Sequence, residues 1–531
     1  MRLFSSARGA RLSLRAACLI APWLALQPLH GVAAPASAAA VAGAATALPP
    51  ELAVAWQATG LPLSSLSLWV QDVQSETPRL VVAGEQPRRM ASVMKLMTTG
   101  VALRTLGAAF QWNTPVALSG PLDAQGVLHG NLHLKASGDP SLDGMRLREA
   151  LQGWRDAGLR EIRGDVVVDR SLWRLPPHDP AAFDGAPWKP YNAGPEPWLL
   201  AHGAITLRWR VAPMEDRASG PMAALVSVYP PLSGMDVDNQ VRLLPKVPCG
   251  EWREGVTPQI TDKPDGSRTL VLRGTYPQAC GSLAWPLRWP ARDGMEHSAR
   301  VFRSAWSALG GQLTGTVREG AWPAGAGAAP WATMSSPSLA EVIRDINKFS
   351  NNVMARQLFL TLGSSMGPSL IPAVPPDAGT LTQARAVVGQ QVRQATRQGN
   401  GLGPCEAPEA LVLDNGAGLS RTEGTSAHCM ARWVQVMWQD ARMPEWVSSL
   451  PVAGQDGTAR RMTAAVGQAH LKTGSLDDVV AIAGIVQTPG GQRQILVAVV
   501  NHPKAEQARP ALQALLQWVN RSPDATLATA P

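Results

Sequence analysis

The sequence predicts a mixed α/β (α+β) fold in which one domain is split by a long β-rich insertion. Apolar strands and amphipathic helices occur towards both ends of the chain, whereas short strands rich in turn residues fill the middle. The change begins near residue 111, and residues 321–330 have the Ala-, Gly- and Pro-rich composition of a linker. At 531 residues the chain is long enough for several domains.

Composition and charge exclude two classes of protein. Apolar residues make up 45% of the chain and charged residues 17%, which excludes an intrinsically disordered protein. The formal charge of +8 suggests a nucleic-acid partner, but residues 1–38 contain four Arg and no acidic residue. Without them the charge is +4 and no basic run remains, so we expect no nucleic-acid partner.

Residues 1–38 have the pattern of a secretory signal peptide. The four Arg precede a mostly apolar stretch, and small residues follow it up to a preferred cleavage site after Ala38. The apolar stretch is too short to span a bilayer and contains Pro22 and Pro28, which disfavours a membrane anchor. We therefore expect a periplasmic protein with at most peripheral membrane association.

Four cysteines remain in the mature chain, and a secreted protein would use them in disulfides. Four cysteines allow three pairings, of which proximity favours Cys249–Cys280 and Cys405–Cys429. Four buried free thiols are the alternative.

No metal or cofactor is predicted. His129 and His133 have a metal-like spacing, but the alternation of apolar and polar residues around them is typical of a strand. Two His residues on one strand face, without a third ligand, are more often exposed to solvent than bound to metal.

Regular elements are expected along the whole chain. The strands expected outside the insertion, from alternating or continuous apolar residues, are 66–73, 80–82, 479–486 and 494–500. The expected helices are 92–106, 338–347, 352–362 and 505–519. The short strands expected within 111–320 are 131–135, 164–169, 204–211, 224–229 and 268–272.

Ser92 and Lys95 form the chain's one Ser-x-x-Lys motif, at the start of an expected helix. One helical turn separates them, so the amine can reach the hydroxyl. A desolvated amine could remove the hydroxyl proton and create a nucleophile. Only eight of the 48 basic residues are Lys, which makes a retained Lys informative. Alone, the pair is better explained by a Ser that caps the helix and a Lys that faces solvent.

Two further motifs follow in the chain. Ser350 and Asn352 join two expected helices and offer a hydroxyl and an amide to a peptide. Lys472, Thr473 and Gly474 lie on a late strand, where a cation beside a hydroxyl can hold a carboxylate. Each motif alone is also compatible with ordinary surface or helix-start residues.

In this order the three motifs resemble those of the serine acyltransferases that include penicillin-binding proteins and class A β-lactamases. The separation of 258 residues from Ser92 to Ser350 far exceeds the class A spacing. A large insertion here is similar to class C low-molecular-mass penicillin-binding proteins, the D-Ala-D-Ala carboxypeptidases and endopeptidases of the penicillin-binding protein 4 type. Residues 134–142, 162–169 and 414–421 also resemble segments of that family.

The resemblance implies roles for the first two motifs. Ser92 would be the acylated nucleophile and Lys95 its general base. Ser350 would relay a proton, and Asn352 would hold the substrate backbone. The backbone N–H groups of Ser92 and Ser475 would form the oxyanion hole.

The resemblance also implies a substrate and an architecture. Lys472, Thr473 and Gly474 would bind the terminal carboxylate of peptidoglycan stem peptides, and β-lactam antibiotics would be covalent inhibitors. A penicillin-binding/β-lactamase-like serine transpeptidase domain would comprise residues 50–110 and 331–520, and the β-rich insertion residues 111–320.

The sequence departs from the family pattern at three places. Ser475 stands where Thr is usual, and Asn351 stands where Asp is common. Lys189 and Pro190 lie where relatives often carry an Asp that recognises a side-chain amine. The side-chain specificity therefore stays open.

Two alternatives remain. One is a β-lactamase or small-ester hydrolase, which needs a Glu base for deacylation; Glu196 is the nearest candidate, but no Asn follows it. The other is a non-catalytic peptidoglycan-binding relative, for which the 19 Trp could provide glycan platforms.

Overall fold

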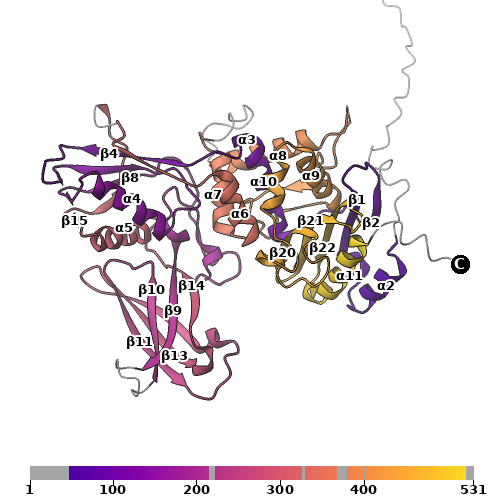
Figure 1. The fold of residues 1–531 in the computed structure, drawn as a ribbon, viewed down its shortest axis with the longest axis horizontal. Helices are drawn as coiled ribbons and strands as arrows, with labels where there is room; N and C mark the ends of the chain where they lie inside the picture. Colours follow the sequence, from indigo (N-terminus) through magenta and orange to yellow (C-terminus); the bar gives the residue numbers. More distant parts are fainter. Residues whose placement is uncertain (1–46, 214–221, 326–328, 367–379, 400, 522–531) are drawn as a thin grey trace, which may run out of the picture.

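The computed structural model describes residues 47–213, 222–325, 329–366, 380–399 and 401–521, and the expected signal peptide lies outside them. A five-stranded antiparallel sheet in the order β2-β1-β22-β21-β20 organises the right half of the molecule in Figure 1. Its strands are β1 (Leu66–Asp72), β2 (Pro78–Val82), β20 (Ala469–Leu476), β21 (Val479–Gln487) and β22 (Arg493–Asn501).

Helices cover both faces of this sheet (Figure 1). Because successive residues of a strand face opposite ways, Ala481 and Ala483 belong to one core and Val480 and Ile482 to the other. The first core is closed by α3 (Lys95–Leu106), α6 (Leu339–Lys348), α7 (Asn352–Leu362), α8 (Thr380–Thr396), α9 (Ala427–Gln439) and α10 (Met443–Ser448). The second is closed by α2 (Pro50–Gln57) and α11 (Arg509–Asn520).

The middle of the chain builds a second body, at the left of Figure 1, around its own hydrophobic core. A mixed sheet in the order β16-β8-β6-β4-β17 contains β4 (Asn113–Ser119), β6 (Asn131–Lys135), β8 (Val166–Asp169), β16 (Val317–Glu319) and β17 (Ala332–Ser335). A small sheet beside it contains β5 (Val127–Leu128), β7 (Glu161–Ile162) and β15 (Gln312–Leu313). The chain enters the mixed sheet by β4 and leaves it by β17, and these two strands pair antiparallel.

Two three-stranded sheets complete this body, at the bottom of Figure 1. Their strands are β9 (Ala204–Pro213), β10 (Met222–Tyr229), β11 (Met235–Leu244), β12 (Val256–Asp262), β13 (Arg268–Pro277) and β14 (Leu283–Arg288). Trp198, Trp209, Trp289 and Trp306 are buried in the core of this body. These four Trp rings therefore pack in the interior and are not available as platforms for a glycan.

Every expected strand and helix is present, with boundaries that differ by a few residues. The middle of the chain also contains two helices that strand alternation did not predict, α4 (Gly144–Asp156) and α5 (Glu296–Ala308). The start of α4 is fixed by Asp143, whose carboxylate accepts hydrogen bonds from two backbone N–H groups of the first turn. Leu147, Leu151 and Trp154 then form one apolar helix face against the second body's core.

The helix expected at 505–519 is divided into η10 (Ala505–Ala508) and α11. Pro510 lies in the first turn of α11, where its missing N–H would have no helical partner in any case. Proline at this position therefore marks the helix start and does not interrupt it.

Two disulfides join Cys249 to Cys280 and Cys405 to Cys429. Disulfides are consistent with a protein outside the cytoplasm. Within the described ranges, no helix is both long enough and apolar enough to cross a membrane.

Removing the second disulfide should destabilise the half of the molecule that contains the five-stranded sheet. Cys405 and Cys429 are 24 residues apart, so Cys405→Ser with Cys429→Ser should lower the free energy of unfolding by about 3 kcal/mol. Urea denaturation under oxidising conditions measures this. The wild type under the same oxidising conditions is the reference, and a loss below about 1 kcal/mol would contradict the prediction.

Candidate active site

Ser92 lies in a tight turn between the five-stranded sheet and α3. The turn is η2 (Ala91–Met94), which runs directly into α3 at Lys95, and Ala91 has a φ of +47°. Two glycines allow other segments to approach this turn. A Cβ placed on Gly418 would lie 1.8 Å from Ala91 O, and one on Gly474 would lie 2.5 Å from Met90 O. Any larger side chain at either glycine would displace the turn that holds Ser92.

Lys95 is fully buried, and its amine contacts three separate segments of the chain. Its Nζ lies 2.8 Å from Ser92 Oγ, 2.5 Å from Asn352 Oδ1 and 2.5 Å from Ala417 O. The predicted meeting of Ser92, Lys95 and Asn352 is therefore present in the structure. Burial lowers the pKa of Lys95 well below its usual value, and the nearby Lys472 cation lowers it further, whereas Glu423 acts in the opposite direction.

Lys472 brings the second and third motifs together. Its buried Nζ donates to Ser350 Oγ at 2.9 Å and to Thr473 O at 2.8 Å. Burial lowers the pKa of Lys472 to about 7. Ser350 has a φ of +57°, and Asn351 accepts a hydrogen bond from Met354 N and so caps α7. The residue that departs from the family pattern at position 351 thus has a structural role.

Thr473 and Ser475 lie on β20, the edge strand of the sheet. Thr473 Oγ1 donates to Thr458 Oγ1 at 2.7 Å, and Ser475 Oγ accepts from Arg509 Nη2 at 2.9 Å. An edge strand offers backbone N–H and C=O groups that a peptide can pair with.

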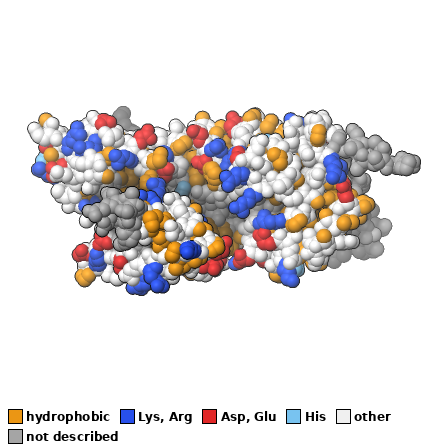
Figure 2. Space-filling model, turned by 60° about the horizontal axis from the view of Figure 1, so that its bottom comes forward, with side chains coloured by type: hydrophobic (Ala, Val, Ile, Leu, Met, Phe, Trp, Pro, Cys, Tyr) orange, Lys and Arg blue, Asp and Glu red, His pale blue; other side chains and the backbone are white. Residues whose placement is uncertain are grey.

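One cavity of about 800 Å3 contains the exposed ends of these motifs. Ser92, Ser350, Asn352, Thr473 and Ser475 all line it, so the structure brings these five predicted residues to one surface. On the face seen in Figure 2, Lys and Arg side chains gather near the middle of the molecule.

Glu423 is a buried residue of the site that the sequence analysis missed. Its carboxylate accepts hydrogen bonds from the backbone N–H groups of Asp414, Gly416 and Gly418, at 3.1, 2.9 and 2.7 Å. It thereby fixes the loop whose Ala417 carbonyl accepts from Lys95. Burial raises the pKa of Glu423, while these N–H groups act in the opposite direction. An acidic residue soon after a Gly-rich turn was the only available sign in the sequence.

Helix α7 is attached to the second body through two buried side chains that were also missed. Arg356 Nη1 donates to the carbonyls of Tyr191 and Ala193, at 3.3 and 3.2 Å. Gln357 donates to Glu196 O at 2.9 Å and accepts from Glu196 N at 3.0 Å. The insertion therefore supports the helix that begins at Asn352.

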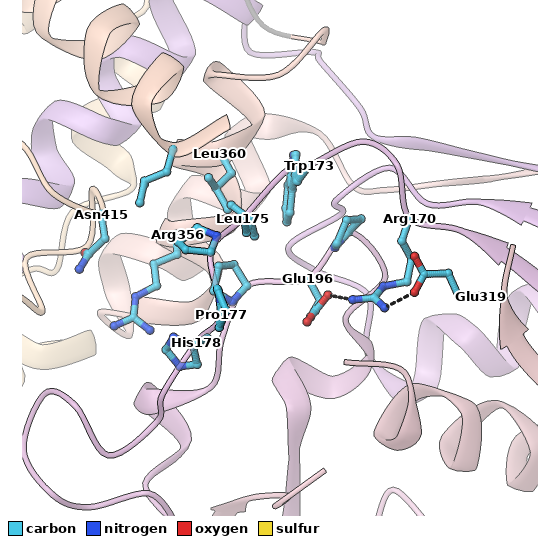
Figure 3. A pocket seen from close by; sticks show the side chains of 14 residues that line it. Arg170, Trp173, Leu175, Pro177, His178, Glu196, Glu319, Arg356, Leu360 and Asn415 are labelled. Atoms are coloured by element: carbon cyan, nitrogen blue, oxygen red, sulfur yellow. Dashed lines mark hydrogen bonds and ion pairs between the residues drawn. The ribbon is translucent and has the colours of Figure 1, made fainter. Parts of the chain in front are cut away.

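Glu196, the candidate β-lactamase base, lines a different cavity from Ser92. This cavity, of about 500 Å3, lies between α7 and the second body, and Figure 3 shows Arg356 on one side and Glu196 on the other. The Glu196 carboxylate forms an ion pair with Arg170, which also binds Glu319 at 2.8 Å. Held in this way, Glu196 does not face the Ser92 hydroxyl.

The two candidate metal ligands have other partners. His129 Nε2 lies 2.8 Å from Asp123, and His133 Nε2 lies 3.0 Å from Ser119 Oγ. Across the part of the chain that the structure describes, no group of three His, Cys, Asp or Glu side chains could hold a metal ion.

Residues 50–522 match the model of the D-Ala-D-Ala carboxypeptidase 3 (S13) family. The chain belongs to this family. The resemblance inferred from the three motifs is therefore confirmed, and with it the class of enzyme, a serine-type D-Ala-D-Ala carboxypeptidase.

Relatives agree with the family assignment. A D-alanyl-D-alanine carboxypeptidase from an Actinomadura species is 30% identical over 446 residues, which cover 80% of this chain and 75% of that protein. A D-alanyl-D-alanine carboxypeptidase from Haemophilus influenzae is 23% identical over 422 residues, or 77% of this chain and 80% of that protein.

The crystal structure of penicillin binding protein 4 from Haemophilus influenzae has the same fold. It superposes with a TM-score of 0.64 at 18% identity and covers 89% of this chain and 99% of that one. The same protein has been crystallised with a β-lactam; that structure has a TM-score of 0.61 at 18% identity and covers 88% of this chain and all of that one. The predicted fold class is therefore confirmed.

Replacing Glu423 with Gln should destabilise the protein, because an amide cannot accept three N–H bonds in the same geometry. We expect Glu423→Gln to lower the free energy of unfolding by about 3 kcal/mol, the order found when one partner of a buried charged network is removed. Chemical denaturation checks this. Glu409→Gln changes an exposed carboxylate two residues before β18 (Leu411–Val412) and is the control; equal effects of both variants would contradict the prediction.

Proposed function

We propose that the chain removes the terminal D-Ala from peptidoglycan stem peptides, and cleaves cross-links between them, through an acyl-enzyme on Ser92. The hydrogen bond between the buried Lys95 amine and Ser92 Oγ carries this proposal. A neutral Lys95 keeps two N–H groups for Asn352 Oδ1 and Ala417 O. Its lone pair is then directed at the Ser92 hydroxyl, the geometry that a general base needs.

In the first step Ser92 Oγ attacks the carbonyl carbon of the scissile amide and gives its proton to Lys95. The C–N bond breaks as the ester to Ser92 forms, and the leaving amine takes this proton from Lys95 through Ser350, which leaves Lys95 neutral again. Water then hydrolyses the ester and restores the Ser92 hydroxyl. Asn352 would hold the backbone of the acyl part during both steps.

Two backbone N–H groups would stabilise the negative charge that develops on the carbonyl oxygen, those of Ser92 and Ser475. The close approach of Gly474, whose added Cβ would lie 3.2 Å from Ser92 N, supports this pairing of η2 with β20. Each such donor can contribute about 3 kcal/mol to the transition state. Lys472 and Thr473 would hold the C-terminal carboxylate of the peptide.

The proposal includes the cellular location and the domain organisation of the enzyme. The charge pattern of residues 1–38 supports export to the periplasm, where stem peptides are found and disulfides form. There the catalytic domain, residues 50–110 and 331–520, would act with the insertion, residues 111–320, attached to α7. β-Lactams would acylate Ser92 and block the site.

Labelled penicillin tests the proposal directly. The mature wild-type protein should form a covalent adduct that Ser92→Ala abolishes. Lys95→Arg should lower the rate of adduct formation by about a thousandfold or more, because Arg keeps the charge but cannot act as a base at neutral pH. Mass spectrometry of the intact protein measures the adduct, and circular dichroism shows that each variant is folded.

Other outcomes distinguish the alternatives. An adduct that survives Ser92→Ala, or an active Lys95→Arg variant, would refute the assigned roles. Rapid turnover of penicillin would favour a β-lactamase. Failure to release D-Ala from a pentapeptide would favour a non-catalytic relative.

The charge of Lys472 should make recognition of the substrate carboxylate depend on pH. Since burial lowers its pKa to about 7, Lys472 is a cation below that pH and loses its charge above it. For two peptides that differ only in a terminal carboxylate or carboxamide, the ratio of their kcat/KM values should fall as the pH rises through about 7. The ratio cancels the titration of Lys95, which affects both peptides. A ratio that stays constant between about pH 5 and about pH 9 would contradict this role.

A further inference from the structure

The cavity that contains Ser92 continues well beyond the proposed carboxylate site. It passes over Thr473 and Ser475 at the edge of β20 and extends to η9 (Gly457–Ala459) and α11. Its volume of about 800 Å3 is far larger than a single alanine leaving group requires. The residues that line the cavity there include Arg461, on the segment after η9, and Arg509, at the start of α11.

Three arginines line this extension, and no Asp or Glu is among the described residues that line the cavity. Arg460 and Arg461 are exposed, and neither guanidinium has a hydrogen bond or ion pair with any described residue. Arg509 is exposed as well and reaches Ser475 Oγ. The acidic neighbours are already engaged: Asp456 binds Lys348, and Glu506 binds Arg509. Arg509 is thus compensated by Glu506, whereas Arg460 and Arg461 keep an uncompensated positive charge that suits a multiply charged anion.

The extension lies on the side of the departing peptide. In the strand register Thr473 is opposite Ile482 and Ser475 opposite Val480, so both side chains face the core that includes α11. Gly474 is opposite Ala481 and faces the other core, with Ser92. In the proposed function, Thr473 holds the carboxylate of the residue that leaves. The cavity beyond Thr473 would therefore contact the rest of the leaving strand.

We propose that Arg460 and Arg461, beside Arg509, bind the carboxylates of an acidic leaving strand, which makes cross-linked stem peptides preferred substrates of this site. The inference rests on the proposed function, because that function sets the direction of the peptide. A departing D-Ala has one carboxylate, which Lys472 and Thr473 would already hold. Further carboxylates on a longer strand would meet guanidinium groups, which bind carboxylates through paired N–H donors.

A substrate pair tests the role of the arginines. One substrate joins a stem-peptide acyl donor to a leaving strand with free carboxylates beyond the scissile bond; the other has those distal carboxylates amidated. In the wild type, kcat/KM should be about tenfold higher for the free form. The double variant Arg460→Gln with Arg461→Gln should bring this ratio close to one, mainly through a higher KM. Arg242→Gln, an exposed arginine on β11, is the matched control and should keep the wild-type ratio.

The outcomes separate this inference from the proposed function. If the double variant lost kcat/KM equally on both substrates, the ratio of the free to the amidated form would be unchanged. That result would overturn the role of the arginines. A ratio of one in a wild type that still forms the Ser92 adduct and releases D-Ala would overturn only this inference. Absence of the adduct in the wild type would instead overturn the proposed function. Thermal unfolding of the double variant confirms that it is folded.

Discussion

The site depends on an amine that has been removed from water. A buried Lys95 must find all its hydrogen-bond partners in the protein, because an unsatisfied buried donor is costly. Those partners come from η2, from the start of α7 and from the loop at residue 417. Three segments far apart in the chain must therefore converge on one nitrogen atom. The five-stranded sheet and its helices supply that convergence, and the same burial makes the amine available as a base.

The sequence predicted an element or a contact correctly where a single local pattern, such as an apolar run or a one-turn spacing, determines it. The apolar run of β21 is continuous because helices cover both faces of the sheet, and the strand was predicted within one residue. Helices α4 and α5 were missed because the Gly- and Pro-rich texture around them favoured strands. The Ser-x-x-Lys pair was found because its two residues are one helical turn apart, whereas Glu423 was not, because its partners are backbone N–H groups without a sequence signature. The contact of Arg509 with the site could not be predicted for a similar reason, because only the tertiary structure brings α11 to Ser475.

The insertion and the catalytic machinery are mechanically connected. Helix α7 begins with Asn352, which binds Lys95, and one turn later Arg356 and Gln357 bind the backbone of the second body. A displacement of residues 191–196 would therefore be transmitted along a rigid helix to the base. The insertion interrupts the sequence of the catalytic half, yet the folded protein uses it as a support for one of the groups that hold the amine.

The exposed edge of β20 has a consequence for the protein without its substrate. Residues 451–453 pair with the outer side of the strand at its start, but at Thr473 and Ser475 this outer side, away from β21, has no strand neighbour among the described residues. Such an edge is a template for pairing with another copy of the chain, and natural proteins guard their edges with charge. The unpaired guanidinium groups of Arg460 and Arg461 repel an identical edge, so the residues that suit an acidic peptide also oppose self-association at high local concentration.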